Sequence, residues 1–277
     1  MTNKQFKLVC SDIDGTLLNK ERQLSARTIA VLSEIGVATP VILISSRMPK
    51  AMKHLQIELG IERRALIAYN GGLVLSYEEG VPKSLLSIEV SIELTELILR
   101  FIQGATIHAS LYHGEEWYVP AMDYWAKREQ HNTKVDPVVA SLSEVCQTWK
   151  TQQIGPHKIM CMGEAGEIQL LENWLTMSFA DQLNVYRSKP TYLEISSKKI
   201  SKLSALAFLL DQQAAIELSE VIAFGDNFND VELIEGVGHG VAVANAKEAL
   251  LAVADEVTLS NLEDGVAVNL AKYFNIS

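Results

Sequence analysis

Two aspartates, Asp12 and Asp14, follow the stretch Leu8-Val9-Cys10-Ser11, and Gly15 comes next. Side chains of an extended strand alternate, so this spacing places both carboxylates on one side of the chain, while the glycine permits a sharp turn. Two carboxylates that converge at the end of a buried strand can hold a hard cation such as Mg2+. An isolated Asp-x-Asp-Gly can equally be a surface turn, so the rest of the chain decides between the two.

Polar side chains also follow the other apolar stretches that we predict to be buried strands. They are Ser45, Ser46 and Arg47 after residues 40–44, Asn70 after residues 65–69, and Asp226, Asn229 and Asp230 after residues 220–224. Lys202 begins a predicted helix. In a parallel sheet the carboxyl ends of the strands meet at one edge, so these groups should converge. Carboxylates, hydroxyls and a lysine are the groups that a phosphate with Mg2+ requires, and a carboxylate can act as nucleophile.

Predicted strands and helices alternate at both ends of the chain. Strands are predicted at 8–11, 40–47, 65–69, 220–224 and 240–243, a hairpin at 73–77 and 81–88, and helices at 25–36, 49–59, 203–210, 231–234 and from Ala246. The strands are apolar throughout, which indicates a sheet covered on both faces. We therefore predict an α/β fold, a Rossmann-like doubly wound parallel sheet.

The alternation is interrupted between residues 88 and 189. Here we predict a helix over 91–103 with Leu94, Leu97, Ile98 and Phe101 on one face. We also predict strands near 105–111, 116–119, 157–162, 183–187 and 193–195, and a helix over 164–179. We interpret residues 88–189 as an α+β cap domain inserted into a core made of residues 1–87 and 190–277.

The composition excludes several classes of partner. The formal net charge is -10 and no cluster of lysine and arginine stands out, which argues against a nucleic-acid partner. The first residues lack the apolar core of a signal peptide, and no apolar run is long enough to span a membrane. Cys10, Cys146 and Cys161 are widely spaced and are expected to be reduced thiols, so we predict a soluble cytoplasmic protein, with its oligomeric state left open.

Taken together, the motifs resemble those of the haloacid dehalogenase superfamily of phosphatases. Asp12-Ile13-Asp14-Gly15-Thr16, Ser45, Lys202 and Gly225-Asp226-x-x-Asn229-Asp230 stand in the order of its four motifs. The insertion after Asn70-Gly71-Gly72 and the ending Gly240-Val241-Ala242-Val243-Ala244-Asn245-Ala246 are similar to the Cof-type branch, subfamily IIB with a type C2 cap. The resemblance covers the whole predicted core domain.

The resemblance implies a Mg2+-dependent phosphatase of small phosphorylated metabolites, such as sugar phosphates, that works through an aspartyl phosphate. Asp12 would be the nucleophile and Asp14 the general acid/base. The metal would be held by Asp12, Asp226 and the main-chain carbonyl of Asp14. The phosphoryl oxygens would be held by Ser45, the backbone N–H groups of Ile13 and Ser46, Lys202 and Asn229, with Asp230, Asn70 and Arg47 as supporting residues.

Some residues have a plainer interpretation. Asp230 is predicted to be a helix N-cap, whatever else it does, and Arg47 can equally be a surface ion-pair partner. The irregular spacing of His108, His113, His131 and His157 favours surface or hydrogen-bonded histidines over metal ligands. The cap residues His113, Glu115, Trp117 and Tyr124 are hypothesised to select the leaving group.

The chain departs from the family pattern at several positions, among them Ser45 in place of threonine and Ala244 in place of glycine. Ser46 and Leu203 stand where glycine is usual, which leaves the turnover rate and the shape of the substrate open. Two alternatives also remain open. The chain could be a phosphotransferase or sugar phosphomutase, which passes the phosphoryl group to a second hydroxyl, or a non-catalytic sensor of a phosphorylated ligand.

Overall fold

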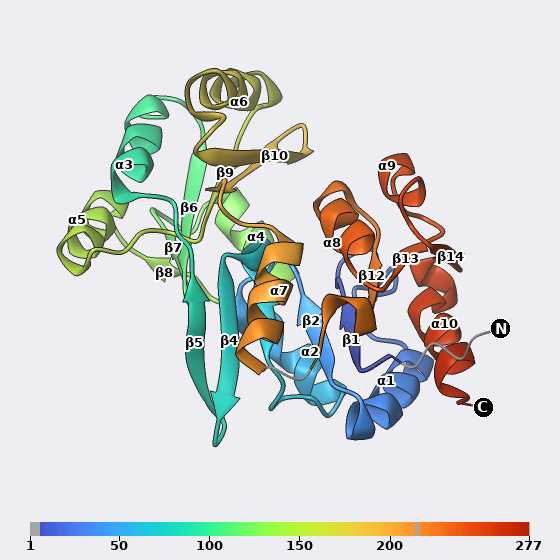
Figure 1. The fold of residues 1–277 in the computed structure, drawn as a ribbon. Coiled ribbons are helices and arrows are strands. Elements are labelled where there is room, and N and C mark those ends of the chain that lie inside the picture. Colours follow the sequence, from blue (N-terminus) through green and yellow to red (C-terminus); the bar gives the residue numbers. More distant parts are fainter. Residues whose placement is uncertain (1–5, 214–215, 277) are drawn as a thin grey trace. The chain divides into compact units, whose positions relative to one another are not determined.

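The computed structural model describes residues 6–213 and 216–276. The chain divides into two compact units, whose elements are labelled in Figure 1. The first unit comprises residues 1–47, 52–86 and 201–277, and the second comprises residues 48–51 and 87–200. Each unit is described by itself below.

In the described part of the chain, the first unit is built on an eight-stranded sheet with the order β14-β13-β12-β1-β2-β3-β4-β5. The strands are β1 (Leu8–Ser11), β2 (Val41–Ile44), β3 (Leu66–Ala68), β4 (Leu73–Glu78), β5 (Val81–Ser87), β12 (Val221–Gly225), β13 (His239–Val243) and β14 (Glu256–Thr258). All pairings from β14 to β3 are parallel, whereas β4 runs antiparallel to β3. The predicted parallel sheet is therefore confirmed for its central strands, and the hairpin adds an antiparallel edge.

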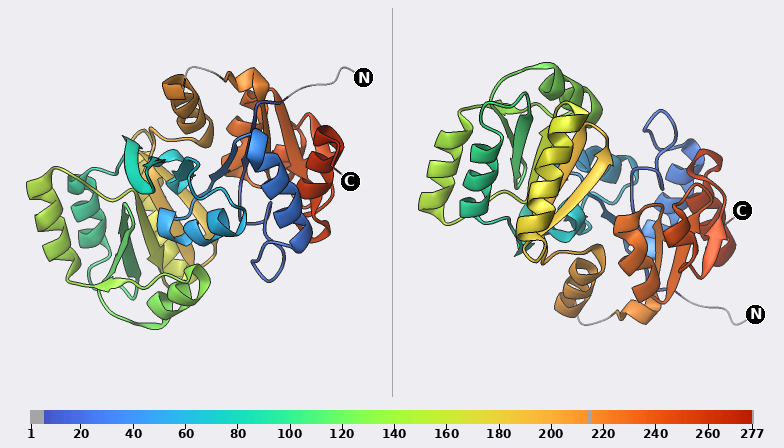
Figure 2. Two further views of the ribbon diagram at one scale, coloured as in Figure 1. Left: turned by 90° about the horizontal axis from the view of Figure 1, so that it is seen from below. Right: turned by 90° about the horizontal axis from the view of Figure 1, so that it is seen from above.

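Helices cover both faces of this sheet. They are α1 (Ala26–Ala38), α2 (Lys53–Glu58), α7 (Lys202–Gln213), α8 (Val231–Gly236), α9 (Glu248–Leu251) and α10 (Gly265–Phe274). Leu206 and Leu209 of α7 belong to one buried cluster with Leu8 and Ile42 of the sheet. Helices α1 and α10 contact each other, and both views of Figure 2 show them side by side. The doubly wound α/β prediction is confirmed.

Helix boundaries differ from the predicted ones in three places. Gly36 does not end the first helix, which runs from the N-cap Ser25 to Ala38. The helix predicted over 49–59 is split into a 3-10 turn, Pro49–Ala51, and α2. Helix α10, which follows β14 after a 3-10 turn at Asn261–Glu263, was not predicted.

The described residues of the second unit form a six-stranded sheet with the order β10-β11-β9-β6-β7-β8. Its strands are β6 (His108–His113), β7 (Glu116–Val119), β8 (Val138–Val139), β9 (Lys158–Met162), β10 (Leu183–Lys189) and β11 (Tyr192–Ser197). Its helices are α3 (Ile92–Phe101), α4 (Tyr124–Thr133), α5 (Leu142–Gln152) and α6 (Ala165–Phe179). Ile98, Trp149 and Leu171 of three helices pack with Ile159 and Ile195 of the sheet, which gives the α+β core that was predicted.

The predicted apolar face of α3 is only partly buried, through Leu94 and Ile98. Ile92, Thr95 and Ile98 are buried, whereas Leu97 is 39% and Phe101 42% exposed. The apolar residues of this helix lie on two stripes, and its periodicity alone does not decide which stripe meets the sheet. The helices α4 and α5 and the short strand β8 were not predicted.

Among the described residues, no helix combines the length and the apolar character needed to cross a membrane.

Candidate active site

A buried lysine joins two aspartates at the carboxyl ends of β1 and β12. Nζ of Lys202, the first residue of α7, lies 2.5 Å from Oδ1 of Asp12 and 2.5 Å from Oδ1 of Asp230. The backbone N–H of Asp12 donates to the carbonyl of Phe224 at 3.0 Å, so the parallel pairing of β1 with β12 continues into the site. The structure thus brings together three of the predicted site residues, which lie far apart in the sequence.

Asp230 stands at the N-cap position of α8, as predicted. Its side chain makes no capping hydrogen bond to that helix. Instead Oδ2 accepts the backbone N–H groups of Asp226 at 3.1 Å and Asn227 at 3.0 Å. The carboxylate therefore ties the preceding loop to Lys202, because that loop turns back over the end of β12.

Asp226 is held by residues of the loop that follows β1. The hydroxyl of Thr16 donates to Oδ1 of Asp226 at 2.8 Å. Gly15 adopts a φ of +86°, and a Cβ at this position would collide with Oδ2 of Asp226. Nδ2 of Asn245 donates to the carbonyl of Gly15 at 2.8 Å. Thr16 and Asn245 stand in the sequence motifs, but no role was predicted for either residue.

The site carries more negative than positive charge. Carboxylate oxygens of Asp12, Asp226 and Asp230 lie within 4.8 Å of one another. Burial, reinforced by the charges of the other aspartates, raises the pKa of Asp12 well above its usual range despite Lys202, and burial raises the pKa of Asp226 to about 6. Burial would lower the pKa of Lys202, but Asp12 and Asp230 outweigh it and raise that pKa. Oxygen ligands with excess negative charge suit a hard divalent cation such as Mg2+.

The side chain of Asp14 has other partners than that of Asp12. Its carboxylate accepts hydrogen bonds from Arg47, whose side chain is 10% exposed, and from Arg22. Burial would raise the pKa of Asp14, but the hydrogen bonds and charge of Arg47, followed by the charge of Arg22, outweigh it and lower that pKa. Arg47 is thus a largely buried partner of a predicted catalytic residue, whereas nothing in the spacing of the sequence pointed to Arg22.

The remaining predicted phosphate-binding residues adjoin one another. Nδ2 of Asn229 donates to Oδ1 of Asn70 at 2.9 Å, and the backbone N–H of Asn70 donates to the carbonyl of Ser45 at 2.9 Å. The buried hydroxyl of Ser45 accepts the backbone N–H of Arg47 at 3.2 Å. Ser46 is half-buried, and Ile13 is fully buried in the turn after β1.

Leu203, one of the departures from the family pattern, is accommodated by Gly236. A Cβ on Gly236 would collide with the side chain of Leu203. The leucine therefore packs where Gly236 has no side chain, and this departure is absorbed by the packing of α7 against α8.

The histidines and aromatic residues named in the inserted segment have different environments. His108 bonds to Asp123 and Ser110 at 2.8 and 2.9 Å, and His131 is exposed, as the favoured interpretation expected. Trp117 is 1% exposed and stacks on Tyr112, whereas Tyr124 is 66% exposed.

Comparisons with known proteins identify the family. The family model for haloacid dehalogenase-like hydrolases matches residues 9–270. The chain belongs to this family. It is 32% identical over 271 residues to a Haemophilus influenzae protein assigned to the phosphatases, covering 97% of this chain and 98% of that protein. It is 26% identical over 268 residues to the Bacillus subtilis 5-amino-6-(5-phospho-D-ribitylamino)uracil phosphatase YcsE, covering 95% of this chain and 93% of YcsE.

A solved structure agrees with this assignment. The crystal structure of a haloacid dehalogenase-like hydrolase from Bacteroides thetaiotaomicron has a TM-score of 0.86 and 28% sequence identity, over 97% of this chain and 99% of that one. The resemblance drawn from the motifs is thus confirmed, and the chain is a phosphatase of the haloacid dehalogenase superfamily.

Proposed function

We propose that this haloacid dehalogenase-like phosphatase hydrolyses small phosphorylated metabolites, such as sugar phosphates, with Mg2+ as its cofactor. The observation that supports this most is the buried contact of Lys202 with both Asp12 and Asp230 beside Asp226. It combines a carboxylate nucleophile, a cation for phosphoryl oxygens and additional carboxylates for a metal. A cytoplasmic location stays a prediction.

In the proposed reaction, a carboxylate oxygen of Asp12 attacks phosphorus, and the bond from phosphorus to the leaving oxygen breaks. Asp14 gives its proton to the leaving alkoxide, so the first products are an alcohol and an aspartyl phosphate. Asp14, now ionised, then takes a proton from a water molecule that attacks the same phosphorus. The bond between phosphorus and Asp12 breaks, and inorganic phosphate leaves.

The other predicted residues bind and orient the phosphoryl group. Lys202, Asn229, Ser45 and the backbone N–H groups of Ile13 and Ser46 are proposed to hold its oxygens. Bound Mg2+, held by the carboxylates of Asp12 and Asp226 and the carbonyl of Asp14, would neutralise charge on the phosphoryl group. Asp230 positions Lys202, while Asn70 positions Asn229 and Arg47 positions Asp14.

We assign separate roles to the two parts of the chain. Residues 1–87 and 190–277 are proposed to form the catalytic core, since every proposed catalytic and phosphate-binding residue lies there. Residues 88–189 are proposed as a cap that selects the leaving group and excludes water. Substituting exposed Tyr124 by alanine should then reorder the preferred substrates in a panel while phosphate release persists.

The test is phosphate release from a panel of phosphorylated metabolites, with Mg2+ and with a chelator, by the wild type and by Asp12→Asn. The panel includes sugar phosphates and the ribitylaminouracil phosphate in the name of YcsE. We expect Mg2+-dependent phosphate release by the wild type and none by Asp12→Asn. The control Asp211→Asn, at an exposed position of α7, should release phosphate like the wild type. Transfer of phosphate to an added sugar would favour the phosphotransferase or phosphomutase, and ligand binding without turnover would favour the sensor.

A further inference from the structure

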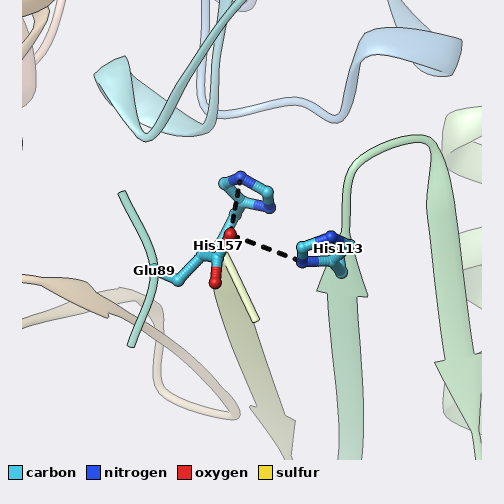
Figure 3. A group of neighbouring side chains, drawn as sticks. All are labelled: Glu89, His113 and His157. Atoms are coloured by element: carbon cyan, nitrogen blue, oxygen red, sulfur yellow. Dashed lines mark ion pairs between the residues drawn. The ribbon is translucent and has the colours of Figure 1, made fainter. Parts of the chain in front are cut away.

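The second unit contains a group of side chains that the proposed phosphatase chemistry does not use. Glu89, His113 and His157 converge, as Figure 3 shows. Glu89 follows β5, His113 ends β6 and His157 precedes β9. Each residue offers one potential ligand atom, and these atoms lie within 4.8 Å of one another.

The distances in this group are too long for direct hydrogen bonds but suit a bridging ion. Oε1 of Glu89 lies 3.9 Å from Nδ1 of His113 and 4.0 Å from Nε2 of His157. Two zinc bonds of about 2.0 Å that meet at a tetrahedral angle separate their ligand atoms by about 3.3 Å. Oε1 of Glu89 would therefore have to approach each imidazole nitrogen by about 0.6–0.7 Å, which small side-chain rotations can supply.

Backbone groups orient two of the side chains. The N–H of Gly155 donates to Oε2 of Glu89 at 2.7 Å, which leaves Oε1 facing the imidazoles. The N–H of Gly114 donates to Nδ1 of His157 at 3.2 Å, so Nε2 is the nitrogen that faces the carboxylate. The hydrogen bond to Glu89 is of the kind found around carboxylate ligands of metals. Coordination through Nε2 of His157 would move the ring proton to Nδ1, so the hydrogen bond from Gly114 would be lost.

The loop that contains Gly155 and Pro156 lies close to the segment after β5. A Cβ on Gly155 would collide with the carbonyl of Val90, and the N–H of Val90 donates to the carbonyl of Pro156 at 2.8 Å. This approach holds Glu89 beside His157. The ligand atoms therefore stand on backbone that is fixed by its own hydrogen bonds.

Further hydrogen bonds of the ligand residues would also have to change. Nδ1 of His113 donates to the carbonyl of Gly155 at 2.7 Å, and coordination through that nitrogen would replace this bond. The hydroxyl of Ser87 lies 2.9 Å from Nε2 of His157 and donates to Oε1 of Glu89 at 2.8 Å. Ser87 is exposed, so its hydroxyl can turn away or serve as a fourth oxygen ligand.

We propose that Glu89, His113 and His157 bind a divalent transition-metal ion of the Zn2+ class. Two imidazole nitrogens and one carboxylate oxygen form a ligand set that zinc favours, unlike the oxygen ligands that suit Mg2+ in the first unit. The irregular spacing of the histidines hid this group, because its members come from separate elements. The ion would join the segment after β5 to β6 and β9 and stabilise the second unit.

The test uses the full chain carrying Asp226→Asn, which weakens the carboxylate site of the first unit. Co2+ is titrated into this protein and followed by its visible absorption and by calorimetry, and Zn2+ is then added to displace it. We expect one Co2+ per chain with the absorption of a tetrahedral nitrogen and oxygen site, and a melting temperature that rises with either ion.

Adding His113→Ala or Glu89→Gln should weaken binding at least about 10-fold, while His131→Ala, a change at an exposed histidine of the same unit, should leave it intact. Glu89→Gln retains an oxygen that accepts from Gly155, so its fold is checked by melting without metal. Two results would overturn the proposal: no stoichiometric Co2+ or Zn2+ binding by the folded Asp226→Asn chain, or binding that both ligand substitutions leave unchanged. The group would then be a hydrogen-bonded network only.

Discussion

Arg47 holds the carboxylate of Asp14 through two hydrogen bonds, from Nε to Oδ2 at 2.6 Å and from Nη2 to Oδ1 at 2.7 Å. Asp14, as the proposed acid, must carry a proton when the leaving group departs, and Arg47 lowers its pKa. Replacing Arg47 by glutamine should raise that pKa. The high-pH limb of the kcat/KM profile, which reports this proton in the free enzyme, should move upward by about one pH unit.

Arg22→Gln is the matched control for this experiment. The Arg22 side chain is 48% exposed and donates one hydrogen bond to Asp14 at 2.9 Å, so its removal should move the limb less. A limb that stays in place in Arg47→Gln would argue against Asp14 as the acid.

Lys202 is expected to stabilise the fold as well as bind phosphate. Replacing it by alanine leaves the carboxylates of Asp12 and Asp230 buried without their cation. Breaking a buried ion pair by removing one partner costs about 3–5 kcal/mol, so urea unfolding should show a loss of that order in the free energy of unfolding. Lys199→Ala, at an exposed position, should leave it nearly unchanged. An equal effect of both substitutions would refute this role.

Gly15 is expected to tolerate no side chain, because a Cβ there would displace the Asp226 carboxylate. Phosphate release by Gly15→Ala should fall about 100-fold, since small misplacements of a catalytic group have effects of that order. Gly60 shares the positive φ but has open space around it, so Gly60→Ala should lose about 1–2 kcal/mol of stability and retain activity. Assays and melting curves of both variants separate misplacement from backbone strain.

We expect the first unit to lose thermal stability at low pH because of Glu256. Burial would raise its pKa, but hydrogen bonds from Tyr273, His239 and Lys272 outweigh it and lower the pKa to about 2. Because this pKa lies below the usual value, the contribution is present above about pH 4.5 and is lost as the pH falls toward 2. Melting temperatures measured between those pH values should fall less steeply in Glu256→Gln than in the wild type. Glu21→Gln, at an exposed position, should follow the wild type.

Much of the fold and part of the site could be predicted from the sequence. The strands of the first unit are short apolar runs, and a parallel sheet collects their polar ends at one edge, so Asp12, Asp226 and Asp230 were placed together in advance. The helices α4 and α5 were not predicted, because they are largely polar and only a few apolar residues mark their buried faces.

The sequence alone determined the family, the α/β core with its insertion, and the residue types of a phosphate and metal site, because these depend on local patterns and motif order. Only the tertiary structure decided which partner each side chain meets. In the structure, Asp14 accepts hydrogen bonds from Arg47 and Arg22, and Asp230 accepts one from Lys202. The structure also places Glu89, His113 and His157 next to one another. Such pairings depend on the register and approach of elements distant in the chain, which residue spacing does not encode.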